Sequence, residues 1–211
     1  MIVDVEQKRT RLSPEARANQ ILEQTADLIQ REGLAAVSME RLARDVGISK
    51  GLVYNYFPSR DALLAALLKR EQDQLRDRGM AEALAAETLE ALIEGTTRLY
   101  LEQTHERSAV ILPLLDDPSV ARLMQASLRE ERDRTIRYFV RAVRHEYGLD
   151  PVTAITAVDT LMNLTGAMGR QVAAGMVSVE DGTAMCVQLI TGGLEKLARS
   201  HRRSFDQQAD R

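Results

Sequence analysis

Residues 38–57 read SMERLARDVGISKGLVYNYF, and this stretch carries the strongest structural signal in the chain. Apolar side chains recur at helical spacing in its first part and again in its last part, which predicts two short helices packed on each other. Gly47 lies between them, where a glycine permits the left-handed backbone of a tight turn. Ser38 and Ser49 precede the two helices as N-caps. This order of elements is typical of a helix-turn-helix.

The second helix of this pair exposes side chains that suit contact with DNA. Ser49 and Lys50 at its start favour a phosphate, and Gly51 leaves room for close approach of the backbone. Tyrosine hydroxyls donate to phosphates, and an asparagine amide hydrogen-bonds base edges. The residues of these types are Tyr54, Asn55 and Tyr56. Spacing alone leaves an alternative open, a helix hairpin that serves only packing.

Helix start and stop signals recur on both sides of this segment, whereas strand signals are nearly absent. Ser13 precedes Pro14 at a helix start, and Gly33 ends that helix. Asp-Pro pairs at 117–118 and 150–151 give two further starts. We therefore expect an all-α fold. Its expected helices lie at roughly 14–32, 39–46, 50–57, 60–78, 81–105, 107–114, 118–147, 151–175 and 178–200.

Residues 33–68, GLAAVSMERLARDVGISKGLVYNYFPSRDALLAALL, resemble the N-terminal domain of the TetR family of transcriptional regulators. The matching features are a first helix that ends at glycine, a serine cap, an Ala-x-x-x-Gly-hydrophobic turn, Tyr-x-Tyr-Phe, and an acidic-Ala-Leu-Leu start of the next helix. The resemblance implies a three-helix helix-turn-helix DNA-binding domain at 13–58 and a helical effector-binding and dimerisation domain at 59–203. Residues 1–12 and 204–211 are expected to be a mobile arm and a mobile tail.

The resemblance also implies DNA contacts residue by residue. Phosphate contacts are implied for Ser38, Ser49, Lys50, Tyr54, Tyr56 and Arg60. Lys50 and Gly51 would also lie near base edges, and Asn55, at a position that varies in the family, would help to set sequence choice. Arg60 stands where the family usually has lysine, which keeps the positive charge but changes its geometry.

Other basic residues of the N-terminal part have two interpretations each. Arg44 is a further candidate for DNA contact, and the alternative is an exposed, solvated side chain. Lys8, Arg9 and Arg11 would form an arm on DNA, or else a disordered basic tail. Pro58 departs from the polar residue that is more frequent in the family, which should stiffen the link without removing the motif.

Two C-terminal helices carry apolar stripes of the spacing that a helix–helix seam requires. In the TetR family the last two long helices pair with those of a second subunit as a four-helix bundle. We therefore assign the stripes to a homodimer interface, and the alternative is packing inside one subunit. The predicted interface residues are Ala154, Val158, Leu161, Thr165, Met168, Val172, Ile190, Gly193, Leu194 and Leu197.

A polar stripe lies roughly 140° around the helix at 151–175 from the apolar one, as the angular spacing of helical residues gives. Facing inward, its members Asp159, Asn163 and Arg170 would bind the polar end of an effector. An internal hydrogen-bond network or a solvated edge is the alternative. Met124 and Phe139 are candidates for the apolar wall of such a cavity. These residues together favour a small lipophilic effector of unknown identity.

Composition narrows the remaining classes of protein. A net charge of −3 hides a basic head, since residues 8–60 carry nine basic and six acidic side chains, a net +3. No apolar run approaches the length of a membrane helix, and no signal peptide is visible. The lone Cys186 excludes an internal disulfide and fits a reducing cytoplasm. We expect no membrane partner.

Two other functional classes fit the sequence poorly. An enzyme is disfavoured because the three histidines fall on separate helices and no phosphate loop or nucleophile motif is present. We expect no catalytic residues, no metal and no cofactor. A helical adaptor would not need Ser-Lys-Gly and Tyr-x-Tyr-Phe on an exposed helix. The expected function is a sequence-specific repressor that a small effector releases from a pseudo-palindromic operator in double-stranded DNA. An activator, or a regulator without a ligand, is the alternative.

Overall fold

The computed structural model describes residues 12–209, with the side chains of residues 12–202. The regular structure of these residues is helical throughout, which confirms the all-α fold class. None of the described helices is both long and apolar enough to cross a membrane. The elements are α1 (Pro14–Glu32), η1 (Leu34–Ala36, a 3₁₀ turn), α2 (Met39–Val46), α3 (Lys50–Tyr56), α4 (Arg60–Ala85), α5 (Leu89–Asp116), α6 (Pro118–Tyr147), α7 (Pro151–Ala173) and α8 (Val179–Ala209).

The described helices begin at side chains that accept a hydrogen bond from an amide of the first turn, which satisfies donors that the helix itself cannot pair. Proline at the first position of α1, α6 and α7 adds a preset helical φ. The capping residues are Ser13, Ser38, Ser49, Ser59, Thr88, Asp117, Asp150 and Ser178.

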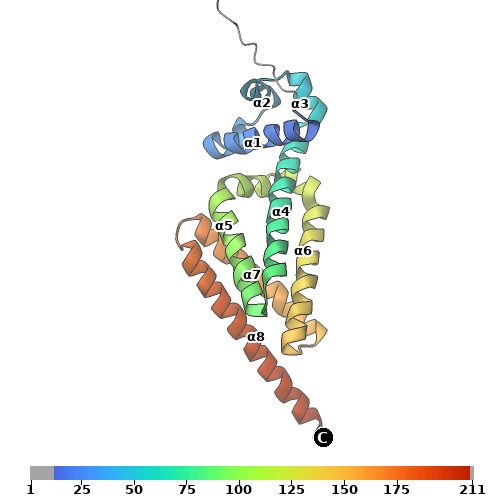
Figure 1. The fold of residues 1–211 in the computed structure, drawn as a ribbon, viewed down its shortest axis with the longest axis vertical. Coiled ribbons are helices and arrows are strands. Elements are labelled where there is room, and N and C mark those ends of the chain that lie inside the picture. The colour runs from blue at the N-terminus through green and yellow to red at the C-terminus, as the bar shows by residue number, and fades with distance from the viewer. Residues whose placement is uncertain (1–11, 210–211) are drawn as a thin grey trace, which may run out of the picture.

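Three expected helix boundaries were wrong. Helix α4 continues past Arg78 to Ala85, because Gly79 keeps right-handed backbone and does not end the helix. Helix α5 begins at Leu89, and it replaces the two expected helices at 81–105 and 107–114. Its last part bends away from the rest in Figure 1 and contains Pro113, which cannot donate to the preceding turn. Helix α8 continues to Ala209, beyond its expected end at residue 200.

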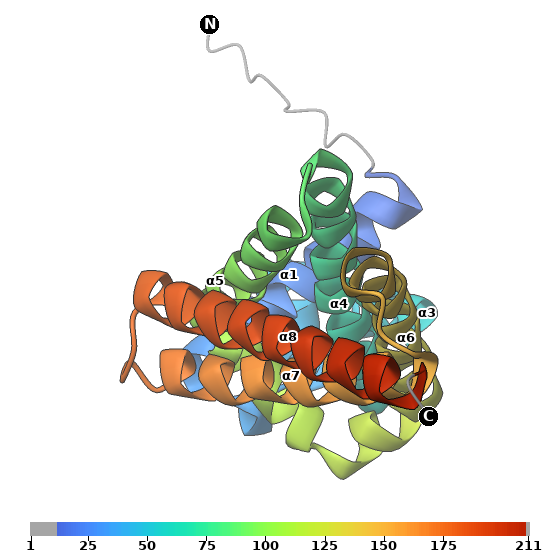
Figure 2. The ribbon, with the colours of Figure 1, turned by 90° about the horizontal axis from the view of Figure 1, so that it is seen from below.

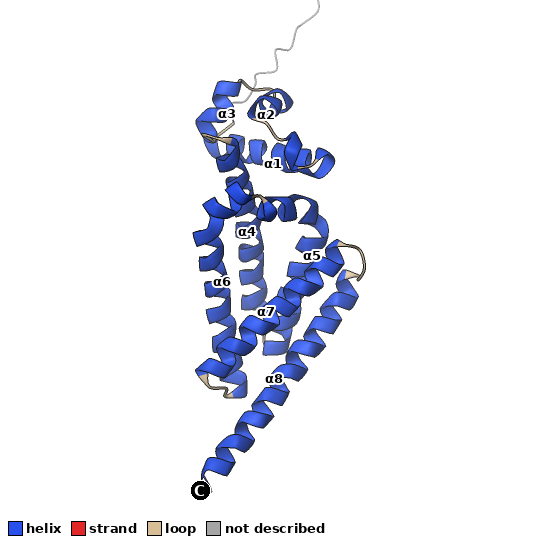
Figure 3. Cartoon of the chain, turned by 180° about the vertical axis from the view of Figure 1, so that it is seen from behind, coloured by secondary structure: helices blue, strands red, loops and turns tan. Residues whose placement is uncertain are grey.

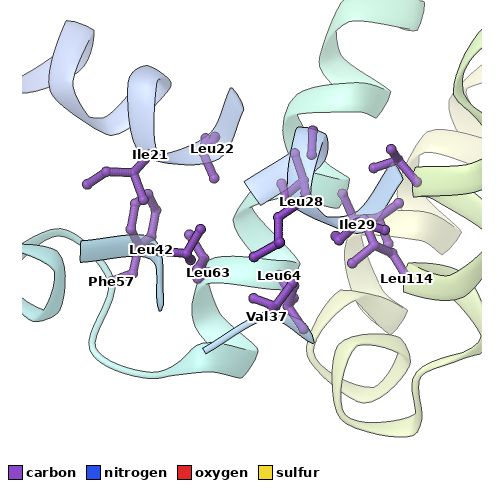
Figure 4. Close-up of a cluster of buried hydrophobic side chains, with 14 of the residues drawn as sticks. Ile21, Leu22, Leu28, Ile29, Val37, Leu42, Phe57, Leu63, Leu64 and Leu114 are labelled. Atoms are coloured by element: carbon purple, nitrogen blue, oxygen red, sulfur yellow. The ribbon is translucent and has the colours of Figure 1, made fainter. Parts of the chain in front are cut away.

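Helices α1–α3 form a head at one end of the molecule (Figure 1). The apolar core of this head continues into α4, α5 and α6, and it therefore crosses the expected domain boundary between residues 58 and 59. Figure 4 shows Leu28 and Ile29 of α1 in one cluster with Leu64 of α4 and Leu114 of α5. The head thus packs on the body through a shared core, besides being joined to it by the chain.

Helices α4–α8 form the body, in which α5 contacts each of the other four. Helices α7 and α8 lie side by side as an outer layer, as Figures 2 and 3 show from two directions. A second apolar cluster fills the space beneath this layer and includes Leu101 of α5, Val158 of α7 and Leu194 of α8. The layer comes very close to α5 at Gly169, where a Cβ would lie 2.9 Å from Cε1 of Tyr100.

Candidate nucleic-acid interface

The turn between α2 and α3 has the backbone that the sequence predicted. The Oγ atoms of Ser38 and Ser49 each accept a hydrogen bond of 3.2 Å from a first-turn amide. Gly47 has φ 71° and ψ 37°, in the left-handed region that glycine adopts without strain. The N–H of Ile48 donates to the carbonyl of Ala43 at 2.9 Å and closes the end of α2. This local geometry sets the direction of α3.

The inner faces of the two helices are apolar and buried. Leu42 of α2 and Val53 of α3 have no exposed surface, and Phe57, which ends α3, is 8% exposed. These side chains belong to the core that α1 and α4 complete. In Figure 1 the α2–α3 pair stands at the end of the molecule opposite the C-terminus. The outer face of α3 is therefore free to meet a large partner such as a duplex.

The residues predicted to contact DNA, apart from Arg60, lie on α2, on α3 or at the first residue before each helix. Six are exposed: Arg44, Ser49, Lys50, Gly51, Tyr54 and Asn55. Two are half-buried, Ser38 at the start of α2 and Tyr56, which packs against the head core. Their DNA contacts stay predictions. Lys8, Arg9 and Arg11, the proposed arm, lie outside the described residues.

Lys50 is held by two groups on the surface of the head. Its Nζ forms an ion pair with the carboxylate of Glu40 in the first turn of α2, and it lies 5.7 Å from the centre of the Tyr54 ring. The hydrogen bond with Lys50 lowers the pKa of Glu40 and raises that of Lys50. Sequence reasoning missed Glu40, because only the packing of α2 on α3 brings residues 40 and 50 together.

Arg60 has a different position from the one that the resemblance implied. Its Nε donates to the carbonyl of Val37 and its Nη2 to that of Leu34, both at 2.9 Å. Leu34 is the first residue of η1 and Val37 follows its last one, so the two bonds span the whole turn. The half-buried guanidinium thus ties α4 to the η1 turn. We therefore propose a structural role for Arg60, and its phosphate contact stays a prediction.

The predicted dimer residues divide into an inner and an outer set. Six are buried inside the subunit, where another subunit cannot reach them: Ala154, Val158, Met168, Val172, Ile190 and Leu194. Leu161 and Thr165 are half-buried, whereas Gly193 and Leu197 are exposed. The apolar stripe of α7 is thus the seam within one subunit, because α5 already covers it. The exposed apolar side chains of the α7–α8 layer are Val152, Ile155, Met185, Leu189 and Leu197.

The five predicted effector residues do not meet in one cavity, and we withdraw them as a set. Asp159 is paired at the surface with Arg132, at 2.6 Å. Asn163 is exposed and donates to the carbonyl of Asp159 on its own helix at 2.9 Å, and Arg170 is exposed. Met124 belongs to the core shared with the head, and Phe139 packs against the other core, in the body. Since the apolar stripe faces inward, the polar stripe faces outward as a solvated edge.

Groups that could support other chemistry are scattered. His105 and His145 are exposed on different helices, and no cluster of three metal-binding side chains occurs among the described residues. Cys186 is buried in an apolar cluster, and burial raises the pKa of its thiol, which disfavours the reactive thiolate.

Comparison with known proteins shows that the sequence of the head matches a family of bacterial regulatory proteins. Residues 21–67 match the family model described as bacterial regulatory proteins, tetR family. The HTH-type transcriptional regulator BetI of Klebsiella pneumoniae is 26% identical over 143 residues, which cover 62% of this chain and 71% of BetI. The nucleoid occlusion factor SlmA of Haemophilus ducreyi is 39% identical over 69 residues, which cover 32% of this chain and 34% of SlmA. The match to SlmA thus spans about a third of that protein's length.

The fold as a whole also has a solved counterpart. A TetR-like transcriptional regulator from Rhodococcus sp. RHA1 superposes with a TM-score of 0.68 at 21% sequence identity. The superposition covers 87% of this chain and 98% of that one, so the likeness of fold includes the body.

Proposed function

We propose that this chain is a DNA-binding transcriptional regulator of the TetR family, and that it is a repressor which a small effector releases from a pseudo-palindromic operator. The observation that carries the proposal is the exposed outer face of α3 at the tip of the molecule, with Lys50, Tyr54 and Asn55 on it. Such a helix fits the major groove of a duplex. We place the protein in the cytoplasm, where a bacterial regulator meets DNA.

The residues of this face divide between phosphates and bases. Lys50 and Ser49 stand at the start of α3, where they contact the phosphate backbone, and the hydroxyl of Tyr54 extends the same contacts. Asn55 presents an amide whose donor and acceptor pair with adenine in the major groove. Gly51 has no atom within 4 Å of the position of a Cβ and lets the backbone approach the bases. Arg44 on α2 reaches a neighbouring phosphate.

A dimer is needed because one short helix reads only one half of a palindrome. We assign the interface to the outer layer of α7 and α8. On α8, Met185, Leu189 and Gly193 recur every four residues on one exposed face, and Ile155 of α7 lies exposed in the same layer. The glycine allows close approach of a second helix. This face replaces the buried stripe as the proposed dimer contact.

Release by an effector follows from how the head is attached. Only residues 57–59 separate α3 from α4, and the core shared by α1, α4 and α5 holds the head in one position on the body. A shift of α4 or α5 therefore moves α3. Major grooves on one side of the duplex recur at about 34 Å, so a few ångströms of movement mismatch one of the two half-sites. The effector need only bind the mismatched arrangement better.

Mapping the DNA that the protein occupies in its own cell tests the proposal. A repressor should occupy sites that overlap promoters, and transcription from those promoters should rise when the gene is deleted. A fall in transcription would identify an activator instead.

Replacing Asn55 with Ala should alter the base preference more than the overall affinity, and an unchanged preference would remove Asn55 from base recognition.

A further inference from the structure

A polar groove of about 490 Å³ lies where the head meets the body. It is bounded by α1 of the head and by α4 and α5 of the body, and its volume is that of a site for a small molecule. The side chains that matter here are Glu23, Arg70, Glu71, Leu75, Gln103 and Arg107. None of the five effector residues expected from the sequence lines the groove.

The inner wall of the groove holds a buried charge cluster. The Glu71 side chain is 2% exposed, and Arg107 donates to its two oxygens at 2.7 and 3.0 Å. Arg70 donates to the same carboxylate at 2.9 Å, and Gln103 donates to the Glu71 carbonyl at 2.9 Å. Burial raises the pKa of Glu71, but the hydrogen bonds from Arg107 and Arg70 outweigh it and keep the carboxyl ionised.

This cluster contains two guanidinium groups and one carboxylate, so it carries an excess positive charge. The Nε atom of Arg70 is also buried without a hydrogen-bond partner, which leaves the cluster short of an acceptor. The balancing charge comes from α1, where the carboxylate of Glu23 forms an ion pair with Nη1 of Arg70 at 3.0 Å. Asp27, also on α1, interacts electrostatically with Arg107 and helps to raise its pKa. The head therefore supplies the second carboxylate that pairs with Arg70.

Glu23 is a weakly held counter-ion. Its side chain is 58% exposed, and an exposed ion pair contributes little because water screens it. A carboxylate from solution offers the same two oxygens to Arg70, and Leu75 gives it apolar contact in the groove. Glu106 and Asp77 on the exposed rim disfavour a ligand with more than one negative charge.

We infer that this groove binds a small organic monocarboxylate, which takes the place of Glu23 on Arg70. The inference rests on the proposed function, since it assigns the chemical class of the effector. When the ligand replaces Glu23, α1 loses its ion pair to α4, while the body keeps a neutral cluster. The ligand therefore stabilises arrangements in which the head has moved, and it lowers the affinity for DNA.

Calorimetric titration of the full-length protein with benzoate, and with benzamide as its uncharged counterpart, tests the inference without DNA. Benzoate should bind and benzamide should not. Glu23→Gln removes the competing carboxylate at an exposed position, so it should tighten benzoate binding by about two- to fivefold. Glu15→Gln, on the same helix but outside the groove, is the matched control and should leave binding unchanged. Equal binding of both compounds, no binding of benzoate, or no effect of Glu23→Gln would overturn the inference.

The two proposals fail separately. Operator binding by the protein without benzoate tests the proposed function, and calorimetry tests the groove. Operator binding that benzoate weakens and benzamide leaves unchanged supports both. A protein that binds its operator normally but does not bind benzoate would overturn the groove inference alone. A protein that binds benzoate but no duplex would overturn the proposed function alone.

Discussion

Lys50 at the start of α3 is paired with Glu40 on α2, so the lysine that is proposed to contact DNA already has an anionic partner in the free protein. Both side chains are more than half exposed, at 53% and 58%. A phosphate must therefore displace Glu40 from Lys50, and Glu40 also places a negative charge near the duplex. We therefore expect this pair to weaken DNA binding, which the helix-turn-helix pattern alone does not indicate.

Replacing Glu40 with Gln should raise the affinity for duplex DNA by roughly two- to fivefold, because the competing ion pair is lost. Fluorescence anisotropy with a labelled duplex at fixed salt measures the effect. Glu15→Gln removes the same charge from α1 and controls for the general change in net charge. If both variants raise the affinity equally, Glu40 has no specific hold on Lys50.

Replacing Arg60 with Lys should destabilise the protein by about 1–3 kcal/mol, since an ammonium cannot span the two carbonyls that the guanidinium bridges. The salt dependence of DNA binding should stay as in the parent protein. Urea unfolding and anisotropy titrations at several salt concentrations measure the two effects. A variant as stable as the parent protein would contradict the structural role of Arg60.

Glu71 predicts a dependence of stability on acid. Burial raises its pKa, the hydrogen bonds from Arg107 and Arg70 lower it by more, and the result lies below the ordinary value of 4.5. The ionised carboxylate therefore stabilises the fold above pH 4.5, and this contribution is lost as the pH falls through the lowered pKa. Glu71→Gln should cost about 3 kcal/mol at neutral pH, because it leaves two partly buried guanidinium groups without the carboxylate that they share.

Urea unfolding of the parent protein and of Glu71→Gln, from neutral pH to below pH 4.5, measures how the ionisation of Glu71 contributes to stability. The difference in unfolding free energy between the two proteins should shrink below pH 4.5, where Glu71 becomes protonated in the unfolded chain and then in the folded one. A difference that stays constant with pH would show that Glu71 does not depend on ionisation for its effect.

Replacing Leu189 with Glu should convert the dimer to a folded monomer, because it places a charge in the proposed interface of α7 and α8. Leu189 is 51% exposed in the single subunit, so the change does not disturb the core. Sedimentation velocity measures the mass, and circular dichroism confirms the helices. Leu84→Glu, at an 83% exposed position on α4, is the control and should remain dimeric. An intact Leu189→Glu dimer would exclude this face.

The parts of the fold that depend only on residues close together in the sequence could be predicted from it. Serine and aspartate caps, first-turn prolines and Gly47 act within a few residues, and the structure has them where the spacing indicated. The predicted boundary between α4 and α5 was wrong because it also relied on a local signal alone. Gly79 gave a local stop signal, but its backbone stays right-handed and the helix continues past it.

Features that depend on which face meets which neighbour could not be predicted. An apolar stripe on a helix shows that something covers it, but periodicity does not say whether the cover is α5 or a second subunit. Val158 and Leu194 were therefore placed in the dimer interface, although they lie inside the subunit. The roles of Glu40 and Arg60 arise from contacts between different elements, and the charge cluster at Glu71 joins residues more than thirty positions apart.

The most direct test of the account is the salt dependence of binding to a selected duplex. Purified protein should enrich a pseudo-palindromic sequence from a random pool, and its affinity for that duplex should fall steeply with salt. Lys50→Ala should bind all duplexes more weakly, with a salt slope reduced by about one for each subunit. A pool that converges on no sequence, or a Lys50→Ala variant with the parent's affinity and salt slope, would contradict the assignment of α3 as the DNA-reading helix.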